Sequence, residues 1–154
     1  MATWLRSRRA LTALALLCAL GTLAAPAYAD GSVSALHMGM GAKDASAMMH
    51  FDAVIEQYNA SGERFRIDSH CQSACTMFLS IRNVCITPNA TLLFHAGGNR
   101  QKAIISRAST DHMLAAYKPA LRQYVTEHHF MDTFELHPIS GREMIARFGY
   151  PACR

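Results

Sequence analysis

Hydrophobic and polar positions alternate with two different periods along this chain. Between Asp44 and Tyr58 apolar residues recur every three or four positions, which predicts an amphipathic helix. Phe65 and Ile67 alternate with charged residues, which predicts a half-buried strand. The same reasoning predicts a strand at 33–38, a helix after Ser73, strands at 84–86 and 91–94, a helix from 109 or 110 to about 129 that Pro119 kinks or divides, and a short helix at 140–148. This alternation of strands and helices predicts an α/β layer structure.

Two polar stretches separate these elements. The residues His70 to Ser73 are expected to form a tight turn between a strand and the helix that follows. The stretch from Asn99 to Ser109 is polar and basic apart from two isoleucines. We therefore expect a mobile loop there that flanks the candidate functional site.

The first 29 residues have the pattern of a secretory signal peptide. Three arginines precede an uncharged run from Ala10 to Ala25, and Ala27-Tyr28-Ala29 closes it. We expect cleavage before Asp30, which leaves a single domain at 30–154, periplasmic or secreted from a bacterial cell. The apolar run is too short to be a comfortable membrane span, so we expect no span in the mature protein.

Removing this leader changes the charge balance. The formal net charge of the whole chain is +4. Without the three arginines of the leader, about 12 basic side chains face 11 acidic ones, a net charge of about +1. No excess of positive charge remains to indicate nucleic acid as a partner.

Four cysteines remain after the leader: Cys71, Cys75, Cys85 and Cys153. An even number in an oxidising compartment predicts two disulfides, although single buried cysteines are the alternative. Of the three pairings, we expect Cys75 with Cys85, which fastens the short helix to the next strand, and Cys71 with Cys153.

A serine at the junction of a strand and a helix is suited to nucleophilic chemistry. The turn lifts the hydroxyl of Ser73 clear of the sheet, and the N–H of Ala74 in the first helical turn can face an oxyanion. His95 ends a nearby strand and is the best candidate for the base that such a serine needs. The alternative is that Ser73 only caps the helix and that His95 is an ordinary strand-end histidine.

Several linked motifs resemble a known family. They are the runs 73–79 (SACTMFL), 86–90 (ITPNA) and 92–95 (LLFH). Together they resemble the proteolytic subunit of Clp protease and the wider Clp/crotonase superfamily, and the Cys-x-Ser-Ala-Cys-Thr motif at 71–76 resembles small exported bacterial Clp-like proteins. The resemblance covers 39–98 and implies a small α/β domain built from repeated β-β-α units.

The resemblance also implies roles for individual residues. Ser73 matches the family's nucleophile and His95 its general base. Ala74 matches one oxyanion donor, and Gly39 or Gly41 lies where the family's Gly-Gly loop supplies the other. The family's third member, an aspartate, has no direct match, because position 136 is leucine; Glu135 or the more distant Asp132 is the candidate.

These matches imply an exported, ATP-independent peptidase that acts through a Ser-His acyl-enzyme mechanism on a flexible peptide or protein. No cofactor is implied, and a homo-oligomer is left open. The rival interpretation is a catalytically inactive, disulfide-stabilised binding or assembly module of the same fold. No metal site is predicted, because adjacent histidines such as His128 and His129 point about 100° apart on a helix and do not ligate one ion easily.

Overall fold

The computed structural model describes residues 31–36 and 45–154. Its elements, in order, are β1 (Gly31–Ser32), α1 (Ala45–Ser61), β2 (Phe65–Ile67), β3 (His70–Gln72), the 3₁₀ helix η1 (Ser73–Ser80), β4 (Val84–Ile86), β5 (Thr91–Phe94), β6 (Gly98–Asn99), β7 (Ile104–Ile105), α2 (Arg107–Ala115), α3 (Pro119–Glu127), β8 (His137–Ser140) and α4 (Gly141–Ala146). The predicted α/β class is therefore confirmed.

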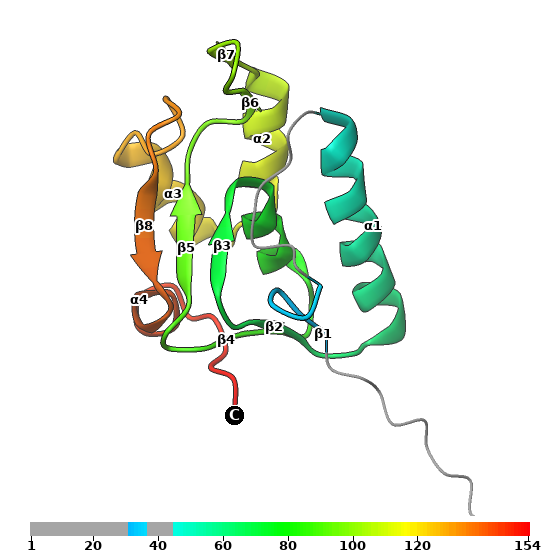
Figure 1. Cartoon of the computed structure of the whole chain (residues 1–154). Helices are drawn as coiled ribbons and strands as arrows, with labels where there is room; N and C mark the ends of the chain where they lie inside the picture. The colour runs from blue at the N-terminus through cyan, green and yellow to red at the C-terminus, as the bar shows by residue number, and fades with distance from the viewer. Residues whose placement is uncertain (1–30, 37–44) are drawn as a thin grey trace, which may run out of the picture.

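The strands form two three-stranded sheets and a small hairpin. The first sheet has the order β1-β2-β4, and all its strands are parallel. In the second sheet β5 lies between β3, its parallel neighbour, and β8, its antiparallel neighbour. The β6–β7 hairpin lies beyond the end of β5, at the top of Figure 1.

The chain visits the two sheets in turn. It passes from β2 in the first sheet to β3 in the second, continues through η1, and returns to β4 in the first sheet and β5 in the second. The backbone stays paired across these corners: the Thr87 N–H donates to the Ile67 carbonyl at 3.0 Å, and the Thr91 N–H donates to the Ser69 carbonyl at 3.4 Å. Two successive strand pairs are thus built in the same way.

One hydrophobic cluster joins these layers. The aromatic ring of Phe78 on η1 packs between Phe51 of α1, at 5.4 Å between centroids, and Phe65 of β2, at 4.6 Å. All three side chains are buried, so α1 covers η1 and the first sheet through its periodic apolar face. The predicted helix at 44–58 is confirmed in type and extends to Ser61, while its expected cap, Asp44, lies outside the described residues.

Three local predictions are wrong. The strand predicted at 33–38 is absent from 33–36, which form a turn after the two-residue strand β1, and 37–38 lie outside the described residues. The backbone turns after Ser32, because the Leu36 N–H donates to the Ser32 carbonyl and the Asp68 carboxylate accepts from Ser34. The turn predicted at His70–Ser73 is strand β3 up to Gln72, since β5 supplies hydrogen-bonding partners for it. The loop predicted at 99–109 contains the β6–β7 hairpin and the start of α2.

No helix within the described ranges, 31–36 and 45–154, is long and apolar enough to cross a membrane. The expected signal peptide at 1–29 lies outside those ranges and remains a prediction.

The first residue of α4, Gly141, sits against the turn that connects the two sheets. Its N–H donates to the Ala90 carbonyl at 2.7 Å, and a Cβ at this position would lie 2.0 Å from the Thr87 carbonyl oxygen. We expect Gly141→Ala to lower the free energy of unfolding by about 3 kcal/mol, the upper end of the range for overpacking, in urea denaturation. The exposed neighbour Arg142, replaced by alanine, should change it by less than about 0.5 kcal/mol. Equal stabilities of the two variants would contradict this close contact.

Candidate active site

Ser73 occupies the junction between β3 and η1 in a strained conformation. Its φ angle is +58°, one of three positive values at non-glycine residues in the described chain. Such a conformation is uncommon outside glycine and persists only where the surrounding structure enforces it, frequently at functional sites. The backbone therefore turns sharply at this serine.

The capping interpretation of Ser73 is wrong. The cap of η1 is Gln72, whose side chain makes no capping hydrogen bond, and Ser73 is the first residue of the helix. Within the described residues the Ser73 hydroxyl has no hydrogen-bond partner, and the residue is 8% exposed and lines a pocket. Its hydroxyl is therefore available for chemistry.

The pocket beside Ser73 has a volume of about 220 Å³. Its lining combines apolar and polar residues and consists of Met48, Ser73, Ala74, Gly97, Gly98, Asn99, Ile104, Ser106, Ser109 and Met113. The predicted pair of Ser73 and Ala74 is thus brought to one cavity. The stretch predicted to flank the site does so, although as a hairpin and a helix start.

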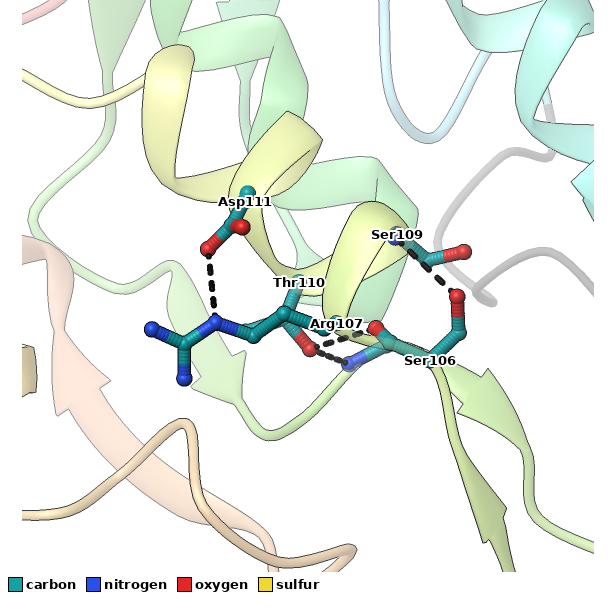
Figure 2. Close-up of polar contacts among 6 residues, drawn as sticks. Ser106, Arg107, Ser109, Thr110 and Asp111 are labelled. Carbon is teal, nitrogen blue, oxygen red and sulfur yellow. Dashed lines mark hydrogen bonds and ion pairs between the residues drawn. The ribbon is translucent and has the colours of Figure 1, made fainter.

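The first turn of α2 fixes one wall of this pocket. Figure 2 shows the Ser106 hydroxyl accepting from the Ser109 N–H at 3.2 Å, and the Thr110 hydroxyl donating to the Ser106 carbonyl at 3.0 Å. The Thr110 hydroxyl also accepts from the Gly97 N–H at 3.0 Å, and Gly97 in turn accepts from the Ser106 N–H at 2.8 Å. The backbone that follows His95 is therefore tied to α2.

His95 emerges from the strand next to that of Ser73. Gln72 pairs with Leu93 in the parallel register of β3 and β5, so Ser73 and His95 leave the same edge of the sheet from neighbouring strands. Such strands lie about 4.8 Å apart. No hydrogen bond joins the two side chains among the described residues, and His95 is not part of the pocket lining.

The imidazole of His95 is held by the backbone carbonyl of the next residue, Ala96. Its Nδ1 lies 2.7 Å from the Ala96 carbonyl oxygen, which can only accept, so Nδ1 carries the proton and Nε2 keeps a free lone pair. Burial lowers the pKa of His95 below its ordinary value of 6.5, the hydrogen bond to Ala96 opposes this, and the charge of Arg100 adds to the lowering. His95 is therefore neutral at pH 7, the state that a general base requires.

Neither predicted carboxylate orients His95. Asp132 is bound to Nδ1 of His129 at 2.7 Å, and Glu135 is exposed, with its N–H on the Thr133 hydroxyl. The Ala96 carbonyl takes the orienting position instead. The only sequence signal for it is the Gly-Gly pair after Ala96, which lets the chain turn back on the histidine.

The hydroxyl of Thr76 stabilises the turn at Ser73 through a hydrogen bond. It donates to the Ser73 carbonyl at 2.7 Å, so the buried Tyr117 hydroxyl, 2.6 Å away, donates to Thr76. Burial raises the pKa of Tyr117 far above its ordinary value, so that its hydroxyl keeps the proton it donates.

Gly39 and Gly41 lie outside the described residues, so the second oxyanion donor stays a prediction. Across 31–36 and 45–154, no group of three or more His, Cys, Asp or Glu side chains is arranged to hold a metal ion.

The four cysteines of the described residues all form disulfides, but the predicted pairing is wrong. Cys71 is bonded to Cys75, and Cys85 to Cys153. The cause is that η1 folds back over the end of β3, which brings Cys75 to Cys71, while the C-terminal segment adds to the edge of β4 through the Ile86–Ala152 bridge and brings Cys153 to Cys85. Two disulfides are typical of proteins in oxidising compartments.

No protein-family model, curated protein or solved structure matches this chain.

Proposed function

We propose that this protein is an exported, ATP-independent serine hydrolase of Clp/crotonase type that acts on flexible peptides. The observation that carries the proposal is the strained conformation of Ser73, which lines a pocket. His95 leaves the same edge of the sheet from the neighbouring strand. Strain of this kind at a strand-to-helix turn is how other serine hydrolases expose their nucleophile.

The proposed reaction is acyl transfer through Ser73. Ser73 Oγ attacks the carbonyl carbon of the substrate, and His95 Nε2 takes the hydroxyl proton. The N–H of Ala74, in the first turn of η1, stabilises the oxyanion, with Gly39 or Gly41 as the second donor. The proton then passes from His95 to the leaving amine, and water hydrolyses the acyl-enzyme by the reverse route.

The Ala96 carbonyl does part of what a triad carboxylate does. It holds the imidazole in the tautomer that presents Nε2 as an acceptor. A carbonyl carries only a dipole, however, and stabilises the imidazolium less than a full negative charge would. We therefore infer a slower enzyme than one with a complete Ser-His-Asp triad.

The path of the chain supports the family assignment. Two successive strand pairs, β2–β3 and β4–β5, each contribute one strand to either sheet, which resembles the expected repeat of β-β-α units. The helix η1 follows the first pair, and the β6–β7 hairpin and then α2 follow the second. The two disulfides support export to an oxidising compartment, where ATP is not expected and substrates must already be flexible.

Labelling with a fluorophosphonate probe tests this proposal. The folded, oxidised protein should be labelled at a single serine, because the probe reacts only with an activated hydroxyl. Ser73→Ala should abolish the labelling, while Ser109→Ala, which changes another serine of the same pocket, should leave it in place. Absence of labelling in the folded protein, or labelling that survives Ser73→Ala, would refute the proposed activity.

The lowered pKa of His95 sets the expected pH dependence. Because only neutral His95 accepts the proton, the labelling rate should be constant near pH 7 and fall as the pH drops through the lowered pKa, with a midpoint below 6.5. Arg100→Ala removes a charge that lowers this pKa and should therefore shift the midpoint upward. A midpoint above 6.5 in the unsubstituted protein would contradict the burial of His95 as the main influence on its pKa.

A second candidate function is a non-catalytic binding or assembly module of the same fold. The observation that favours it is that both candidate carboxylates lack a contact with His95 in the described chain. This candidate predicts a folded protein that the probe does not label and whose partner capture is unchanged by Ser73→Ala.

A further inference from the structure

The Cys71–Cys75 disulfide encloses Ser73 symmetrically. Cys71 lies on β3 and Cys75 on η1, so the ring contains two residues of chain on either side of the serine, counting each cysteine. The two Cα atoms are 5.3 Å apart. Four residues of extended chain would span about 13 Å, so the ring forces the backbone to reverse direction within it.

This reversal coincides with the strain at the serine. Cys71 and Gln72 belong to β3, and Ala74 and Cys75 belong to η1, so the chain changes direction at the residue between them. Ser73, at the centre of the ring, takes that role with its φ of +58°. Since the side chain of the cap residue Gln72 makes no capping hydrogen bond, η1 has no ordinary capping interaction to impose this conformation.

Both sulfur-bearing side chains are fully buried, so the ring is shielded from solvent in the native protein. The second disulfide, Cys85–Cys153, lies away from Ser73. It joins residues 68 apart in sequence and borders a different pocket, and neither of its cysteines lines the Ser73 pocket. The chain therefore contains one disulfide around the proposed nucleophile and one remote from it.

We propose that the Cys71–Cys75 disulfide is a positioning device that holds Ser73 in its left-handed conformation and keeps its hydroxyl directed at the pocket. This inference rests on the proposed hydrolase function for its effect on reactivity. The Thr76 hydroxyl, which binds the Ser73 carbonyl, secures the same turn from inside the helix. The disulfide acts on the geometry of Ser73, whereas the remote disulfide acts on the stability of the whole domain.

The test compares two double variants, Cys71→Ala/Cys75→Ala and Cys85→Ala/Cys153→Ala, with the unsubstituted protein. Alanine is chosen because a serine would bury a hydroxyl without a partner. Fluorophosphonate labelling is measured at a temperature where circular dichroism shows all three proteins folded, over a range of probe concentrations that separates probe binding from the bond-forming step.

For Cys71→Ala/Cys75→Ala we expect the bond-forming step to slow roughly ten- to a hundredfold, because small displacements of a reacting atom have effects of this size. Probe binding and the pH midpoint set by His95 should change little. The remote double variant should react within about twofold of the unsubstituted rate, since neither of its two cysteines lines the Ser73 pocket. Normal labelling of folded Cys71→Ala/Cys75→Ala, or equal slowing of both variants, would overturn the inference.

Hydrogen exchange separates this inference from the proposed function. If the unsubstituted protein is not labelled, the hydrolase proposal fails, and the positioning role is judged from the amides of 71–80. Faster exchange there in Cys71→Ala/Cys75→Ala alone would support it. Unchanged exchange, or the same increase in the remote variant, would overturn it.

Discussion

Replacing His95 by glutamine is expected to slow fluorophosphonate labelling of Ser73 by about 10²- to 10⁴-fold, the usual contribution of a general base. Glutamine keeps a polar side chain of similar length but cannot take up a proton at pH 7. The effect should appear in the bond-forming step, because His95 does not line the pocket that receives the probe. Labelling rates of the two proteins, measured at several probe concentrations, check this.

The matched control is His128→Gln. His128 is also held through Nδ1 by a backbone carbonyl, that of Tyr124 at 2.9 Å, but it is exposed and borders a different pocket. Its replacement should leave the labelling rate unchanged. If the His95→Gln protein is folded and labels as fast as the His128→Gln protein, another group must activate Ser73.

Removal of the Cys85–Cys153 disulfide should produce the largest loss of stability. It closes a loop of 68 residues in sequence separation, and a chain-entropy estimate gives about 4 kcal/mol for a loop of this size. The same estimate gives about 2 kcal/mol for the Cys71–Cys75 ring, with a separation of 4. Urea denaturation of the two double alanine variants should therefore rank Cys85→Ala/Cys153→Ala as the less stable protein.

The structure gives a second reason for this ranking. The C-terminal segment adds to β4 through two hydrogen bonds, from the Ile86 N–H to the Pro151 carbonyl at 2.8 Å and from the Cys153 N–H to the Ile86 carbonyl at 3.0 Å. Loss of the disulfide removes the covalent link that holds this segment against β4. A larger destabilisation from removing the Cys71–Cys75 disulfide would mean that the turn at Ser73 contributes more to stability than the chain-entropy estimate allows.

The opposite order is expected for reactivity, and this makes the pair of disulfides informative. The variant that loses more stability should keep its labelling rate, and the variant that loses less should label slowly. If the less stable of the two variants is also the one that labels more slowly, the labelling rate depends on the stability of the fold and not on the position of Ser73.

Much of the architecture was predictable from local patterns. The helix α1 and the strands β2, β4 and β5 lie where the apolar period indicates, and Pro119 opens the separate helix α3, one of the two outcomes considered for it. These elements carry their own signals, because the residues that bury them are their neighbours in sequence.

The elements that were missed depend on pairing with distant strands. Strand β8 contains Pro138, which argues against a central strand. Proline is tolerated there because β8, paired with β5, is an edge strand of its sheet in the described part of the chain. Strand β3 is short and half polar, and β5 alone among the named strands makes it extended. Neither segment has an apolar period that could reveal it.

The sequence by itself determined that a helix begins at Ser73 and that His95 stands at the end of a strand before two glycines, because each depends on residues within a few positions. Only the tertiary structure decided which cysteines pair, that the pocket is closed by the hairpin and α2, and that a backbone carbonyl orients His95. Disulfide pairing and pocket closure depend on which remote segments become neighbours. The orientation of His95 depends on how the backbone after it is tied to α2, which no local pattern encodes.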